Sequence, residues 1–326
     1  WEEFAEPVAG LLVQEGALLA WAGDRLLVRK GAVRRIVQLP APVLSAARRG
    51  GLTAVVLENN RVLVLDDAGH ALNGGTGTAL PETVPVPLAA EEVSPPSLAT
   101  GEDGAFILCG SRGGVYRLAA PVWRPLLLWQ AKKGISAPPG FFPGGWAVGA
   151  FTGELAFFTN GASAPRRVLA LPAIPDCPPL FLNGQFFLTS REPQLCRHDF
   201  ASGAVRHKNG LPLWVNELML LDGKLLGRFW RGGLLACQPG GRMKNIWRHP
   251  SAAGLTLPLV DGFALYCGAA DGVLRALFRY NGGLMGSLHL GQGPVLRPVR
   301  FGGMVLAACG RRIFHIRLKG QDEPVW

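Results

Sequence analysis

Charged residues are scarce in this chain, and long amphipathic helical segments are missing. Only 17% of its 326 residues are Asp, Glu, Lys or Arg, whereas 48% are hydrophobic. A disordered chain needs the opposite balance, so this composition excludes intrinsic disorder. No segment in which apolar residues recur with the helical period is long enough to form a substantial helix. This argues against a helical bundle.

Motifs of catalytic and metal centres are also missing. The six cysteines are scattered without C-x-x-C spacing, so neither a zinc motif nor a redox motif is supported. The sequence has no H-E-x-x-H, no G-x-x-x-x-G-K-[ST] and no G-x-S-x-G. We therefore predict no catalytic residue, no cofactor and no metal site, although His198 and His207 could face each other across a hairpin. The paired carboxylates Glu2-Glu3 are expected to be solvated loop charges.

The sequence leaves the cellular compartment open. Its longest uncharged stretch, residues 134–153, contains three prolines and six glycines, which is typical of strands and turns rather than of a transmembrane helix. Residue 1 is Trp, so we expect the chain to be processed or cut from a longer protein. Scattered cysteines favour the cytoplasm over the periplasm.

Glycine and proline, by contrast, are abundant, at 44 and 26 residues. That much turn material favours many short strands joined by tight turns. A turn glycine followed by an apolar run recurs at intervals of 35, 53, 41, 39, 39, 39 and 41 residues. These glycines are Gly16, Gly51, Gly104, Gly145, Gly184, Gly223, Gly262 and Gly303.

Each repeat has room for four strands. A turn former often precedes the glycine, as in Asn183-Gly184 and Asp222-Gly223, and such pairs suit the type I′ turns of β-hairpins. A second turn and a third strand follow the apolar run. Candidate fourth strands are Val33–Leu39, Leu126–Trp129, Arg166–Leu171, Lys244–His249 and Leu284–Leu290. Four strands in roughly 40 residues are typical of a β-propeller blade.

The repeats predict an all-β protein, an eight-bladed β-propeller of four-stranded antiparallel blades. One domain would cover residues 1–326, with a long inter-blade loop near 72–92, where one interval is longer than the others. The alternative is a propeller of seven blades in which the two ends of the chain share one blade.

One repeat points to a family. Residues 271–283, Asp-Gly-Val-Leu-Arg-Ala-Leu-Phe-Arg-Tyr-Asn-Gly-Gly, resemble the quinoprotein-like (PQQ-like) propeller repeat, D-G-x-L-x-A-L-x-x-x-x-G. Residues 62–69 and 114–118 agree with it in part. The resemblance implies eight blades, and it suggests Trp129 and Trp247 for the tryptophan that docks neighbouring blades. The adjacent cysteine pair of quinone-dependent dehydrogenases is missing, which favours the non-enzymatic branch.

Basic residues give the strongest hint of a partner. Lys and Arg number 33 against 23 Asp and Glu, a net charge of +10 that favours anionic partners. Several of them fall at or beside the turns between second and third strands, which share one face of a propeller, and an aromatic residue adjoins them. The predicted partner-binding rim comprises Arg112, Arg191, Arg231, Arg311, Arg312, Lys132, Lys133 and Trp230.

Three functions remain open at this point. The first is a non-catalytic scaffold that binds another protein through its loop face, as a subunit of a larger complex. Two settings known for PQQ-like propellers are the outer-membrane assembly lipoprotein of the bacterial periplasm and propellers linked to ATPase complexes. The second is nucleic-acid binding through the basic rim, with an affinity that falls steeply with salt. The third is a diverged enzyme with a central-channel pocket, which would need carboxylates gathered from several leading strands.

Overall fold

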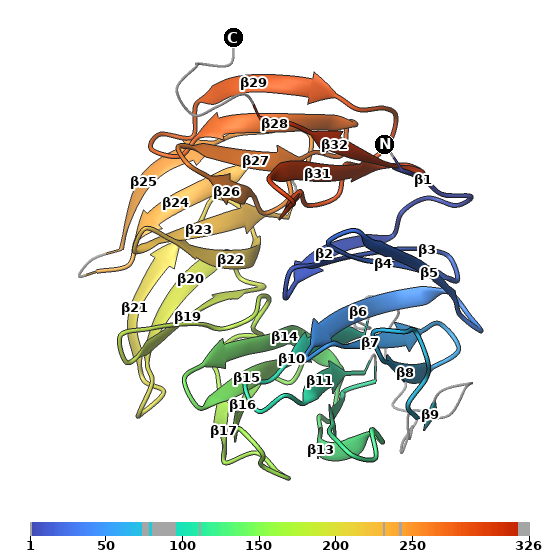
Figure 1. Ribbon diagram of the computed structural model, residues 1–326. Helices are drawn as coiled ribbons and strands as arrows, with labels where there is room; N and C mark the ends of the chain where they lie inside the picture. Colours follow the sequence, from blue (N-terminus) through green and yellow to red (C-terminus); the bar gives the residue numbers. More distant parts are fainter. Residues whose placement is uncertain are drawn as a thin grey trace. The chain divides into compact units, whose positions relative to one another are not determined.

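The fold is all-β throughout the part of the chain that the structure describes. The computed structural model describes residues 2–73, 78–79, 96–110, 112–230, 232–240 and 243–318. These residues form eight four-stranded antiparallel sheets and no helix (Figure 1). The eight-bladed β-propeller predicted from the glycine spacing is therefore confirmed. The alternative is wrong in its number of seven blades, although the two ends of the described chain do share one blade, as that alternative assumed. The described residues therefore contain no helix that is long and apolar enough to cross a membrane.

We number the blades in chain order, and each is one sheet. Blade 1 contains β2 (Gly10–Gln14), β3 (Ala17–Ala22), β4 (Arg25–Lys30) and β5 (Val33–Gln38). Blade 2 contains β6 (Val43–Arg49), β7 (Leu52–Leu57), β8 (Arg61–Leu65) and β9 (Thr78–Ala79). Blade 3 contains β10 (Ser97–Thr100), β11 (Phe106–Cys109), β12 (Gly114–Leu118) and β13 (Leu126–Gln130). Blade 4 contains β14 (Ile135–Phe142), β15 (Gly145–Ala150), β16 (Glu154–Thr159) and β17 (Arg167–Ala170).

The remaining four blades repeat this order. Blade 5 contains β18 (Leu180–Leu182), β19 (Gln185–Ser190), β20 (Gln194–Asp199) and β21 (Val205–Gly210). Blade 6 contains β22 (Val215–Leu221), β23 (Lys224–Phe229), β24 (Leu234–Gln238) and β25 (Lys244–His249). Blade 7 contains β26 (Leu259–Asp261), β27 (Ala264–Gly268), β28 (Val273–Phe278) and β29 (Leu284–His289). Blade 8 contains β30 (Val299–Phe301), β31 (Met304–Cys309) and β32 (Arg312–Ile316), with β1 (Glu2–Glu3) as its fourth strand.

Strand β1 was not expected from the sequence. Glu2 pairs with Ile313 and Glu3 pairs with Arg312, so residues from the two ends of the described chain complete blade 8. The expectation that Glu2-Glu3 is a solvated loop is wrong, because the Glu2 side chain is only 13% exposed and its Oε1 lies 3.3 Å from Arg29 Nη1. The pairing partners lie about 300 residues away along the chain, so no local pattern could reveal the strand.

Part of the predicted inter-blade loop has regular structure. Within residues 72–92, Thr78–Ala79 form β9 and pair with β8. The Asn73 side chain supports this arrangement, because its Nδ2 donates to the Val62 carbonyl at 3.0 Å and its Oδ1 accepts from Val64 N at 3.0 Å. Residues 74–77 and 80–92 of this range lie outside the described residues.

The chain divides into two compact units. One is formed by Trp1–Val43, Leu221–Pro239 and Lys244–Trp326, and the other by Leu44–Leu220 and Gly240–Met243. Blades 1, 7 and 8 belong to the first unit, and blades 3, 4 and 5 belong to the second.

The hairpin turns between first and second strands follow the predicted pattern in part. In blade 3 the predicted pair Asp103-Gly104 lies in a longer turn, because Thr100 pairs with Phe106. At Asn183-Gly184 both residues have positive φ, 49° and 68°, which is the type I′ geometry expected for this pair. Asp261 instead ends β26 and pairs with Ala264, so its turn lies one residue later. Its carboxylate accepts a hydrogen bond from Arg300 Nη1 at 2.6 Å, in the first strand of blade 8.

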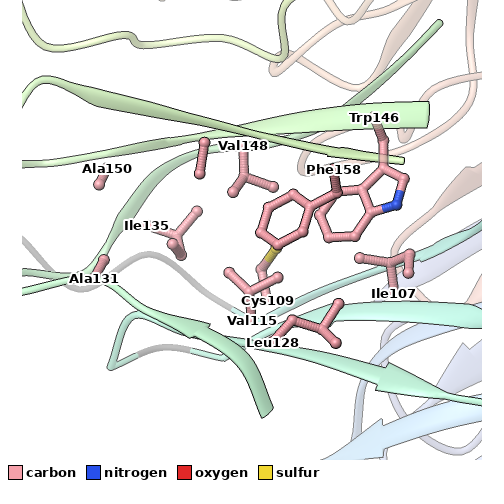
Figure 2. Packing of buried hydrophobic residues seen from close by; sticks show 11 residues of the cluster. Ile107, Cys109, Val115, Leu128, Ala131, Ile135, Trp146, Val148, Ala150 and Phe158 are labelled. Carbon is pink, nitrogen blue, oxygen red and sulfur yellow. The ribbon is translucent and has the colours of Figure 1, made fainter. Parts of the chain in front are cut away.

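Packing between neighbouring blades forms the core. Figure 2 shows one such cluster, in which apolar residues of blades 3 and 4 meet and the rings of Trp146 and Phe158 stack with centroids 4.0 Å apart. Trp129 of blade 3 packs against the same cluster. The ring of Trp247 in blade 6 covers Gly282 of blade 7, where a Cβ would lie 2.5 Å from the ring. Of the two tryptophans suggested by the repeat, Trp247 thus contacts the following blade, and Trp129 packs against a cluster that the two neighbouring blades share.

Five phenylalanines join blades 4 and 5. Phe157 lies among them, with ring centroids 5.8 Å from Phe186, 5.8 Å from Phe200 and 6.3 Å from Phe181. Phe142 completes the group, with its centroid 4.7 Å from that of Phe181. The edge-to-face geometry of these rings adds to the apolar area that they bury.

Phe157→Ala should lower the free energy of unfolding by about 3–5 kcal/mol, because it removes a buried ring contacted from several sides. Denaturant titration followed by tryptophan fluorescence measures the loss. Phe141→Ala, an exposed phenylalanine in the same unit, is the control and should cost much less. Equal losses in the two variants would contradict this account of the cluster.

Candidate functional site

Three predicted basic residues come together at one end of blade 3. Arg112 lies in the turn between β11 and β12, and its neighbour Gly113 accepts a hydrogen bond from Ala131 N at 3.0 Å. This bond holds the turn against the connection between β13 and β14, which carries Lys132 and Lys133. All three basic side chains are exposed to solvent.

Gly113 is what allows this close approach. Its φ is +89°, and a Cβ at this position would lie 2.5 Å from the Lys133 carbonyl oxygen. Any larger residue would therefore push the turn away from the connection. The glycine keeps the Arg112 backbone next to that of Lys132 and Lys133, although the residues are about 20 positions apart in sequence.

Further contacts link the connection that carries Lys132 and Lys133 to blade 4, and blade 4 to blade 5. Phe151, in the turn between β15 and β16, donates its backbone N–H to the Gly134 carbonyl at 3.0 Å. The guanidinium of Arg191, in the turn between β19 and β20, lies 4.7 Å from the centre of the Phe151 ring. Arg191 Nε is also 3.9 Å from Asp176 Oδ1. Burial raises the pKa of Asp176, while the charge of Arg191 acts in the opposite direction.

An exposed tryptophan that sequence reasoning missed lies beside the Arg191 turn. The connection between β21 and β22 is held to that turn by the hydrogen bond from Leu211 N to the Pro193 carbonyl, at 2.7 Å. Trp214 follows in this connection and is 49% exposed, and Leu213 is also exposed. The run Leu-Pro-Leu-Trp carries no sequence signal of exposure. We call Arg112, Lys132, Lys133, Arg191 and Trp214 the loop strip; all five belong to the second unit.

The other predicted rim residues belong to the first unit. Arg311 and Arg312 lie at the turn between β31 and β32, and Arg312 Nε is 3.2 Å from Glu3 Oε1. Trp230 lies in the turn between β23 and β24 and is 57% exposed. Arg231 is outside the described residues. The rim predicted from the sequence is thus divided between the two units, and its members in the first unit occupy separate blades.

The histidine pair does not assemble. His207 pairs with Arg197, the residue next to His198 in β20, so the rings of His198 and His207 lie on opposite faces of blade 5. The His198 ring stacks on Phe186, with centroids 4.7 Å apart, and its Nδ1 is 3.1 Å from the Gly203 carbonyl. Within the described ranges, no three His, Cys, Asp or Glu side chains are grouped so that they could hold a metal ion.

The six cysteines are free and buried. Burial raises the pKa of Cys109 and Cys267 to about 12 and that of Cys177 to about 11. A thiol acts as a nucleophile only as its thiolate, so these residues pack as small apolar side chains at neutral pH.

The sequence matches no protein-family model and no curated protein. Its structure is similar to that of the computationally designed protein Ika8, with a TM-score of 0.77 and 14% identity over 97% of this chain and 98% of that chain. It is also similar to BamB from Moraxella catarrhalis, a PQQ-like propeller repeat protein, with a TM-score of 0.73 and 16% identity over 99% of both chains. At these identities the likeness shows the propeller fold alone.

Burial of the thiols predicts very slow reaction with a disulfide reagent. The native chain at pH 8 should release almost no thionitrobenzoate from 5,5′-dithiobis(2-nitrobenzoate) within minutes, whereas all six cysteines should react in guanidinium chloride. Rapid modification of any thiol in the native chain would contradict the burial described above.

Burial of His198 should make the free energy of unfolding depend on pH in the acidic range. Burial lowers the pKa of its imidazole, so below pH about 6.5 the unfolded chain binds a proton that the folded chain excludes. The free energy of unfolding therefore falls as pH drops through this range. His198→Gln should melt at a lower temperature at pH 7.5 and show a smaller further decrease between pH 7.5 and 5.5. Parallel pH profiles for the two proteins, measured by thermal melts, would show that His198 does not contribute.

Proposed function

We propose that this chain is a non-catalytic scaffold that binds an acidic protein partner through the loop strip. The observation that carries the proposal is the gathering of Arg112, Lys132 and Lys133, all exposed, at one corner of blade 3. Three positive charges on turns held by backbone hydrogen bonds need little reorganisation to meet carboxylates. The net charge of +10 further attracts an acidic partner and speeds its encounter.

The rest of the strip favours a protein over a phosphate backbone. Beyond Lys133 the next basic member is Arg191, which lies over the Phe151 ring and near Asp176, so its charge is partly offset. Trp214 and Leu213 instead offer exposed apolar area. Tryptophan is enriched among the residues that carry protein–protein binding energy, whereas phosphate binding relies on cations in series.

The first strands of the blades support the non-catalytic part of the proposal. A diverged enzyme would need carboxylates gathered from several of these strands. In the described first strands, the carboxylates are Glu217 of β22 and Asp261 of β26, and they belong to different units. Asp261 is already hydrogen-bonded to Arg300 at 2.6 Å.

The test is affinity capture from native lysate, with and without nuclease, read by mass spectrometry. We expect one stoichiometric acidic protein that survives nuclease. The triple variant Arg112→Glu, Lys132→Glu, Lys133→Glu should weaken its binding by at least about tenfold, because three attractive contacts become repulsive. Isothermal titration with the purified partner measures the change.

The matched control reverses three exposed basic residues of blade 1, Arg25→Glu, Lys30→Glu and Arg35→Glu, with the same total change in charge. It should retain most of the affinity. Equal losses in the two variants would show that net charge alone matters. If the captured material is lost after nuclease treatment and its affinity falls steeply with salt, the proposal of a protein partner is wrong. That result would establish nucleic-acid binding instead.

A further inference from the structure

The sheet edge of blade 7 is unusually open. Its fourth strand, β29, is the outermost strand of the sheet (Figure 1). It reads Leu-Met-Gly-Ser-Leu-His and contains no Asp, Glu, Lys or Arg. Gly286, Ser287, Leu288 and His289 are all exposed. A Cβ built on Gly286 meets no atom within 4 Å, so the face of the sheet is uncovered at this residue. Soluble proteins usually protect such an edge with charged residues or proline, because its free backbone groups can pair with another strand.

Other described fourth strands follow this protective rule. Of those with four or more residues, most carry basic side chains: Arg34 and Arg35 in β5, Arg167 in β17, Arg206 and Lys208 in β21, and Lys244 and Arg248 in β25. Strand β13 also lacks charge, but within it only Leu126 is exposed. An edge that is both uncharged and exposed is therefore confined to β29 among these strands.

The hydrogen bonds of β29 show which backbone groups are free to pair. Leu290 N donates to the Gly272 carbonyl at 2.9 Å, and the same register places Leu288 opposite Leu274. In an antiparallel pair, alternate residues bond to the partner strand and those between them point away from it. Leu288 therefore bonds inward to β28, whereas the N–H and C=O groups of Ser287 and His289 point outward from the sheet.

Exposed apolar side chains lie at the start of this edge. Phe278 N donates to the Gly283 carbonyl at 2.7 Å, which places the end of β28 beside the first residue of β29, Leu284. Phe278, Tyr280 and Leu284 are 40%, 69% and 56% exposed. Exposed aromatic and aliphatic side chains next to a free edge are suited to hold the side chains of an added strand.

We propose that β29 is a strand-addition site that takes an extended segment of the acidic partner, a role that rests on the proposed function. The backbone of the segment pairs with Ser287 and His289, and an apolar side chain of the segment packs on Phe278 and Leu284. A second copy of this chain is a poor occupant, because each copy carries a net charge of +10. The basic fourth strands of blades 1 and 6, in the same unit, favour acidic residues flanking the segment.

Ser287→Pro blocks the edge without breaking the blade. Proline removes an N–H that points outward, so the bonds between β28 and β29 remain. The matched control is Ile36→Pro in β5. Leu39 N donates to the Asp24 carbonyl at 2.8 Å and Ile36 pairs with Leu27, so Ile36 N–H also points outward. Thermal melts of both variants should stay close to that of the parent chain.

The probe is a display library of random twelve-residue linear peptides, selected on the full chain. We expect enriched peptides that alternate apolar residues and contain more Asp and Glu than Lys and Arg. A synthetic peptide from this set should bind Ser287→Pro at least about tenfold more weakly than the parent and bind Ile36→Pro equally well. Amide hydrogen exchange should slow at residues 286–289 when the peptide is bound.

Three results would overturn the strand-addition site: no enrichment over an unrelated basic protein, equal binding to Ser287→Pro, or protection of another segment. A parent chain that dimerises in sedimentation, with Ser287→Pro monomeric, would assign the edge to a second copy instead. If the captured protein partner binds Ser287→Pro as tightly as the parent chain, the strand-addition site is wrong, but the proposed scaffold function stands.

Discussion

Apolar packing of one blade on the next is the interaction on which the rest of this structure depends. All six residues of β3 are buried, as are all six of β15, because these strands are covered on both faces of their sheets. A four-stranded sheet alone could not bury both faces, so no blade is expected to be stable without a neighbour. This also explains why only 17% of the chain is charged: the middle strands have little solvent-facing surface on which to place charge.

Ion pairs between neighbouring blades add little to the stability that apolar packing provides. Arg279 bonds to Asp222 between blades 7 and 6, and Arg300 bonds to Asp261 between blades 8 and 7. One side chain of each pair reaches solvent, Asp222 at 46% and Arg300 at 53% exposed, and solvent-exposed pairs contribute only about 0–1 kcal/mol each. The two pairs therefore orient the hairpin turns rather than hold the fold. Stability comes from the strands, which leaves the turn side chains available for function. The loop strip shows the result, since its cations lie on turns positioned by backbone hydrogen bonds.

The candidate site was only partly predictable. Basic residues at the turns were visible in the sequence, and the topology of a propeller placed the turns at one end of the blades. Which charges lie together depended on the tertiary structure: Arg191 lies on Phe151 and near Asp176, whereas Lys132 and Lys133 lie beside the turn of Arg112. The exposure of Trp214 could not be predicted, because the sequence gives the residue type and not whether its side chain is exposed or buried.

The sequence by itself determined the fold class and most strands, and it favoured eight blades over seven. The range Lys244–His249 predicted for a fourth strand is that of β25, and Leu126–Trp129 differs from β13 by one residue. These features are local, because turn glycines and apolar runs report the backbone conformation of their own neighbourhood. Only the tertiary structure decided that β1 completes blade 8, that His198 and His207 lie on opposite faces, and that the edge of β29 is open. Each of these depends on pairing register or on contacts with distant residues, which a local pattern does not encode.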